Sequence, residues 1–133
     1  MLTRVVLCGS FHRDASALHL LFKELEATGC RVLSPLSIEF LDPTAKFVKS
    51  DSELTATSKE LESFHLRAIR EADLIFLHAP DGYVGLSTAF EIGYAEALSK
   101  PVFSKHELKE VVVNQRIVKV ISVFEALEQL NTA

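Results

Sequence analysis

The stretch LIFLHAPDG, residues 74–82, decides how this 133-residue chain folds. Four apolar side chains in succession, followed by a histidine, are typical of a strand that is covered on both faces of a sheet. A proline, an aspartate and a glycine come directly after, and these residues end a strand and favour a turn. The stretch therefore predicts a buried strand over 74–78 and a loop at its carboxyl end.

Further strands and helices are predicted on both sides of this stretch. Short apolar runs indicate strands at 5–8, 30–33, 102–103 and 117–121, and residues 111–113 are also strand-like. Amphipathic patterns with capping residues predict helices from Asp14 to a cap at Gly29, from Thr57 with Glu60 to Asp73, from Ser87 or Thr88 to before Lys100, and from Ser122 with Glu125. Residues 35–57 lack a periodic pattern, so we expect a long connection there.

Strands that alternate with helices at this spacing predict βαβ units with right-handed crossovers. We therefore expect an α/β fold: a single domain over residues 1–133, doubly wound, with a mostly parallel sheet of four to five strands and helices on both faces. Flavodoxin-like and Rossmann-like proteins have this architecture. The length is that of one domain with one core.

Composition and charge exclude several classes of partner. The net charge of −4, from 14 basic and 18 acidic residues, gives no broad positive surface, so we expect no nucleic acid polymer as a ligand. Apolar runs are too short for a membrane span or a secretion signal, so we expect no membrane association and a cytoplasmic location. The five histidines are scattered and no metal-ligand spacing occurs, so neither a metal nor a cofactor is predicted. Cys8 and Cys30 are expected to pack as small apolar side chains.

Ligands of open parallel sheets bind at the carboxyl ends of the strands, where two loops of this chain should meet. These loops follow the first and third predicted strands, and each leads into a helix N-terminus that favours an anion. Neither has the glycine pattern of a dinucleotide fold or of a phosphate loop. The candidate substrate-binding residues in them are Gly9, Ser10, Phe11, His12, Arg13, Gly82, Tyr83, Gly85, Ser87 and Thr88.

The second of these loops and its helix, DGYVGLSTAFEIGYA at 81–95, resemble the nucleoside 2-deoxyribosyltransferase family and the related 2'-deoxynucleoside 5'-phosphate N-hydrolases. In that family the helix begins with one or two small residues and then reaches a Glu-hydrophobic-Gly motif, which Glu91-Ile92-Gly93 matches. Cys8-Gly9-Ser10 and Ala72-Asp73 extend the resemblance.

The resemblance implies that the Glu91 carboxylate attacks C1' of a deoxyribose, that the base departs, and that the glycosyl ester is released to water or to another base. It also implies a small-molecule nucleoside or nucleotide substrate and a homodimer or higher homo-oligomer, in which Phe40, Phe47 or the tail could supply contacts. From the residues alone, a capping box of Thr88 and Glu91 is favoured, in which the glutamate would only close its own helix, and the resemblance reverses this preference.

His65 is a departure from the family, which has an aspartate eight residues before Asp73. It lies on the helix stripe that should face the sheet, so it is either a buried, hydrogen-bonded histidine or a proton carrier at the crevice. Asp81 is the other candidate proton carrier, although Asp-Gly is also ordinary turn chemistry. The missing aspartate motivates an alternative function, a non-catalytic nucleotide-binding or sensing module with the same crevice.

Several of these residues also have structural interpretations. Ser87 and Thr88 fit N-capping as well as phosphate binding, and His12 fits a solvated turn. The small residues Ala89, Gly93 and Ala97 recur at four-residue spacing, which predicts close packing of their helix on the sheet.

Overall fold

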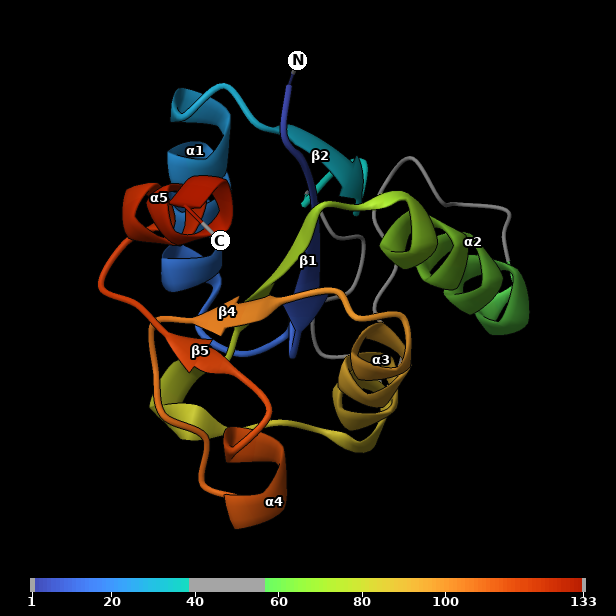
Figure 1. The fold of residues 1–133 in the computed structure, drawn as a ribbon. Coiled ribbons are helices and arrows are strands. Elements are labelled where there is room, and N and C mark those ends of the chain that lie inside the picture. Colours follow the sequence, from blue (N-terminus) through green and yellow to red (C-terminus); the bar gives the residue numbers. More distant parts are fainter. Residues whose placement is uncertain (1, 39–56, 133) are drawn as a thin grey trace.

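Five parallel strands form one sheet, with helices on both of its faces (Figure 1). The computed structural model describes residues 2–38 and 57–132. In chain order its elements are β1 (Arg4–Gly9), α1 (Ala15–Ala27), β2 (Arg31–Ser34), α2 (Ser58–Glu71), β3 (Leu74–His78), a 3₁₀ turn (Pro80–Gly82), α3 (Leu86–Ala97), β4 (Val102–Ser104), α4 (Val111–Asn114), β5 (Val118–Lys119) and α5 (Val123–Thr132). The predicted fold class is confirmed.

The strands lie in the order β2-β1-β3-β4-β5, so the chain winds outward in both directions from β1 and β3. These two strands pair over the full length of β3, from Val5 opposite Leu74 to Gly9 opposite His78. Strand order reverses between them, and open parallel sheets bind ligands at such a point, at the carboxyl edge where the loops after β1 and β3 begin. This is the edge at which the sequence places the candidate site.

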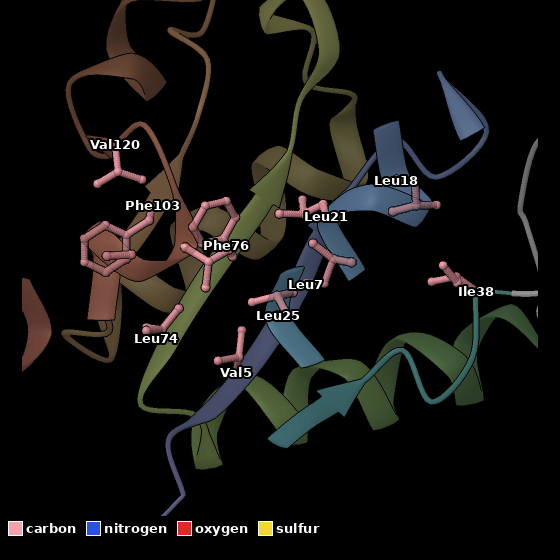
Figure 2. Close-up of a cluster of buried hydrophobic side chains, with 12 residues drawn as sticks. Val5, Leu7, Leu18, Leu21, Leu25, Ile38, Leu74, Phe76, Phe103 and Val120 are labelled. Atoms are coloured by element: carbon pink, nitrogen blue, oxygen red, sulfur yellow. The ribbon is translucent and has the colours of Figure 1, made fainter. Parts of the chain in front are cut away.

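Side chains of β1 alternate between the two faces of the sheet, as the pleat of a strand requires. Val5 and Leu7 join the core cluster that includes residues of α1 and α5, shown in Figure 2. Val6 and Cys8 point the other way, into the cluster that includes residues of α2 and α3. Figure 1 shows α1 and α5 together on one side of the sheet and α2 and α3 on the other. Cys8 therefore belongs to the layer that carries the candidate site.

The predicted caps of the first two helices are confirmed. Asp14 caps α1, because its side chain accepts a hydrogen bond from the backbone N–H of Ala17 at 3.2 Å. Thr57 and Glu60 form a reciprocal capping box at the start of α2. Among the described residues, no helix is both long enough and apolar enough to cross a membrane.

Three local expectations differ from the structure. The strand-like run 111–113 is the helix α4, whose first turn is capped by the side chain of Glu110. The predicted strand at 117–121 is present but shorter, as β5.

Gly93 and Ala97 are exposed and Gly93 has open space beside it, so the small-residue ridge does not pack on the sheet. The buried residues of α3 are instead Thr88, Glu91, Ile92 and Ala95. Residues 39–56, which include Phe40 and Phe47, lie outside the described residues.

Candidate active site

Glu91 lies in the second turn of α3 and is only 7% exposed. The helix begins at Leu86, and its N-cap, Gly85, forms no side-chain capping bond. Thr88 is therefore the third helical residue and cannot cap the helix for Glu91. The alternative of a Thr88–Glu91 capping box was wrong because the helix starts earlier than the sequence pattern indicates. The carboxylate is turned toward α2, with its Oε1 3.5 Å from Nε2 of His65.

His65 on α2 is hydrogen-bonded through both ring nitrogens. Its Nε2 lies 3.2 Å from Sγ of Cys8 on β1, and its Nδ1 lies 2.6 Å from Oγ of Ser34 on β2. The side chain is 12% exposed. Of the two interpretations of this histidine, the buried and hydrogen-bonded one is therefore present, and the same ring also contacts the candidate nucleophile. Residues of three other elements, β1, β2 and α3, therefore meet at this side chain.

Glu62 is a member of this cluster that the sequence analysis missed. It precedes His65 by three residues on α2, a spacing that puts both side chains on one helix face. Its Oε2 is buried and has no donor within reach. Burial and the nearby charge of Glu91 raise the pKa of Glu62 to about 8. Glu62 is therefore protonated at neutral pH, and a protonated carboxyl can donate a hydrogen bond to Glu91, which a second carboxylate could not.

The charges in this cluster are unequally distributed. Burial by itself would raise the pKa of Glu91, but hydrogen bonds and charge from His65, followed by bonds from Glu62 and Cys8, outweigh it and lower the pKa. Burial and the negative charge of Glu91 raise the pKa of the Cys8 thiol well above its usual value. At neutral pH the cluster therefore holds one carboxylate, Glu91, beside a protonated Glu62 and a neutral thiol. A carboxylate nucleophile has to be ionised in this way.

The two predicted loops meet at the carboxyl edge of the sheet. Gly9 has φ +150°, and a Cβ on it would lie 2.1 Å from the carbonyl oxygen of His78, so only glycine allows β1 and β3 to end this closely. The Arg13 guanidinium lies over the Tyr83 ring, 3.6 Å from its centroid. Such a contact is a cation–π interaction, and it ties the loop after β1 to the loop after β3.

A buried histidine holds the first of these loops in place. Nε2 of His78 lies 2.7 Å from the carbonyl oxygen of Arg13, to which a neutral imidazole can donate its proton. Burial lowers the pKa of His78, which favours the neutral ring. Sequence patterns gave no sign of this contact, since the two residues are far apart in the chain.

The remaining predicted site residues lie around this crevice in different environments. Ser10 and Thr88 are buried, whereas His12, Asp81 and Ser87 are exposed. Asp81 occupies the 3₁₀ turn, outside the buried cluster. The others are Phe11, which packs against the core on the α1 side of the sheet, Gly82, whose φ is +76°, and Gly85, which lies beside Tyr83 and Ser10.

Three atoms of the cluster are also donors that a metal ion can use. Sγ of Cys8, Nε2 of His65 and a carboxylate oxygen of Glu91 all lie within 4.8 Å of one another. The sequence pattern does not indicate this group, because its members have no close metal-ligand spacing along the chain. These three residues come from β1, α2 and α3, and only the fold brings them together.

A parallel sheet of this strand order defines a small doubly wound α/β protein, and the buried Glu91 carboxylate is its candidate active-site group. Residues 5–117 match the sequence model of a family described as nucleoside 2-deoxyribosyltransferase. The chain belongs to this family of enzymes, and the predicted family is confirmed.

Two solved structures share the fold at low sequence identity. A CMP N-glycosidase of Clostridium botulinum, BcmB, is 18% identical, with a TM-score of 0.57 and 98% of each chain covered. A 2-deoxyribosyltransferase of Bacillus psychrosaccharolyticus is 20% identical, with a TM-score of 0.61 and 95% of this chain and 90% of that chain covered. No curated protein matches the sequence.

Proposed function

We propose that this protein cleaves the N-glycosidic bond of a deoxynucleoside or nucleoside 5'-monophosphate, with Glu91 as the nucleophile. The observation that carries the proposal is the Glu91 carboxylate, which is buried, faces His65 and is not used to cap its own helix. The family supports the same chemistry, and the two solved relatives are, by their titles, a CMP N-glycosidase and a 2-deoxyribosyltransferase.

The reaction has two balanced steps. In the first, Oε of Glu91 forms a bond to C1', the bond from C1' to the base nitrogen breaks, and the base takes up a proton. In the second, water attacks C1', the ester bond to Glu91 breaks, and the water gives up a proton as Glu91 regains its charge. We favour water over a second base as the acceptor, so that the overall reaction is hydrolysis.

The contacts of Glu91 suggest how the neighbouring residues divide the work. A displacement at C1' places the nucleophile and the leaving base on opposite sides of the sugar carbon. His65 and Glu62 contact Glu91, so they belong to the attacking side, and we assign them to orienting the carboxylate. Asp81, in the loop after β3, is free of that cluster. We therefore propose Asp81 as the proton carrier for the base.

The crevice also suggests where a 5'-phosphate would bind. Ser87 and Thr88 lie in the first turn of α3, whose free N–H groups and dipole favour an anion. Arg13 adds a positive charge from the loop after β1, held in place by Tyr83. We propose these groups, together with the backbone of Gly9 and the hydroxyl of Ser10, as the phosphate and sugar contacts.

Base release is the direct test. The protein is incubated with deoxynucleosides and with their 5'-monophosphates, and free base is measured by chromatography. We expect turnover that Glu91→Gln abolishes, whereas Glu96→Gln, an exposed glutamate on the same helix, retains it. Retained turnover in Glu91→Gln would remove Glu91 from the mechanism. A 2'-fluorinated substrate, whose glycosyl ester is released slowly, should add one sugar to Glu91 by mass spectrometry.

His65 favours a second candidate function, because the family has an aspartate at this position. A nucleotide-binding or sensing module would use the same crevice without chemistry. Nucleotide binding by calorimetry without any base release would favour that function over catalysis.

A homo-oligomer and a cytoplasmic location stay predictions. Leu86 and Phe90, 92% and 59% exposed on α3, are apolar residues that a second copy could cover. Light scattering of wild type and Phe90→Asp tests the oligomer.

A further inference from the structure

We propose that Cys8, His65 and Glu91 bind a zinc ion, and that zinc bound there inhibits cleavage of the glycosidic bond. The three donors are a sulfur, an imidazole nitrogen and a carboxylate oxygen, which is a set that zinc prefers. The inhibitory part rests on the proposed role of Glu91, whereas binding of the ion does not.

The distances between the donor atoms fit a tetrahedral ion. With bonds of ~2.3 Å to sulfur and ~2.1 Å to nitrogen, tetrahedral zinc holds these two ligand atoms roughly 3.6 Å apart, and it holds a nitrogen and an oxygen roughly 3.3 Å apart. In the structure Sγ of Cys8 is 3.2 Å from Nε2 of His65, and that nitrogen is 3.5 Å from Oε1 of Glu91. These two pairs need shifts of only a few tenths of an ångström, and the third pair, Sγ of Cys8 and the Glu91 oxygen, lies within 4.8 Å.

The surroundings of His65 orient it as a ligand. A metal-binding histidine usually donates the N–H of its second ring nitrogen to a fixed acceptor, which sets the tautomer. Here Nδ1 lies 2.6 Å from Oγ of Ser34, a buried hydroxyl that can accept this proton. A zinc ion would take the place of the Nε2 proton that faces Glu91 in the metal-free protein, and this proton would leave to solvent.

Glu62 interacts with Glu91 at the side of this cluster. Its Oε2 is buried without a hydrogen-bond partner, so positive charge nearby would be favourable for it. A water molecule would complete the four ligands of the ion.

Zinc binding and catalysis would compete for the same atom. When the ion binds, the S–H bond of Cys8 is replaced by an S–Zn bond and its proton leaves to solvent. The thiolate and the Glu91 carboxylate together balance the charge of the ion. An oxygen of Glu91 that is bound to zinc is not available to attack C1', so the loaded enzyme is inactive until a chelator removes the ion. Magnesium, which prefers oxygen ligands, should not have this effect.

Cobalt reports the site directly, because a thiolate bound to Co²⁺ gives a charge-transfer absorption band in the near ultraviolet. We expect Co²⁺ titration of the whole protein to reach one equivalent, and Zn²⁺ to displace it. The band should be absent in Cys8→Ser, and Zn²⁺ affinity should fall by more than the roughly 10- to 100-fold loss typical of outer-sphere changes. Cys30→Ser is the matched control, because Cys30 packs in the cluster on the other face of the sheet.

Two results would overturn the metal site: no band in folded wild type, or a band that Cys30→Ser abolishes and Cys8→Ser retains. His65→Gln is a second variant, and an undiminished band in it would also contradict the site. Base release is measured separately, with and without Zn²⁺. Full activity of the zinc-loaded protein would refute inhibition, whereas no base release from metal-free protein would refute the proposed function and leave the cobalt result to decide the site.

Discussion

Replacing Glu62 with glutamine should stabilise the protein at alkaline pH and leave its stability unchanged at acid pH. Glu62 has an ordinary pKa of 4.5, raised to about 8 in the fold. Between these values the folded state holds a proton that the unfolded state has lost, so wild-type stability falls as pH rises. Below about pH 4.5 both states are protonated, and the penalty disappears. Glutamine cannot ionise, and its N–H₂ can donate to Glu91 as the protonated carboxyl does.

The size of the effect follows from the same pKa. Linkage sets an upper limit of ~4–5 kcal/mol at pH 8. Because the Glu62 side chain is only partly buried, solvent screening reduces the expected gain to about 1–2 kcal/mol. A domain of this size should then melt roughly 3–6 °C higher in Glu62→Gln than in wild type at pH 8.

Thermal unfolding followed by circular dichroism at pH 5 and pH 8 measures this difference. Glu71→Gln is the matched control, because Glu71 is an exposed glutamate on the same helix, and it should show no pH-dependent gain. A Glu62→Gln protein that is less stable than wild type at pH 8, or whose difference from wild type is the same at both pH values, would refute the shared proton between Glu62 and Glu91.

Three further predictions concern the residues around the cluster and the loops. Gly9→Ala should destabilise the protein by about 2–4 kcal/mol, since its Cβ would lie 2.1 Å from a backbone oxygen. Gly93→Ala, at a helix position with open space beside it, should stabilise the protein by ~0.5–1 kcal/mol. Urea unfolding measures both variants, and equal effects would contradict the close approach at Gly9. Ser34→Ala should cost about 1–3 kcal/mol by leaving Nδ1 of His65 without its partner, and an unchanged urea midpoint would count against that bond. Arg13→Ala should raise KM for a nucleoside monophosphate by roughly tenfold, because one charge-assisted contact is lost, and should change KM for the nucleoside little. Equal changes in KM for both substrates would exclude phosphate binding by Arg13.

Much of the architecture could be read from the sequence because it depends on local patterns. Buried strands of a parallel sheet are apolar runs, and the capping residues Asp14 and Thr57 mark helix starts within a few residues. The sequence pattern gave the wrong start and the wrong buried face for α3, whose apolar residues lie on all sides of the helix. It also indicated a strand at α4, because valines favour strands, but Glu110 caps a helix there. Tertiary packing decided which face of α3 is buried, whereas the local cap at Glu110 accounts for α4, which buries no residue.

Neighbours in the chain and a short motif were enough to predict the strand–helix order, the two loops at the carboxyl edge and Glu91 as the leading candidate. The surroundings of that carboxylate could not be predicted in this way. Cys8, Ser34, Glu62 and His65 come from β1, β2 and α2, and strand pairing and helix packing bring them to Glu91. A pKa depends on burial and on charges through space, so the ionisation of Glu91 and the proton on Glu62 exist only once the sheet and its helices have assembled.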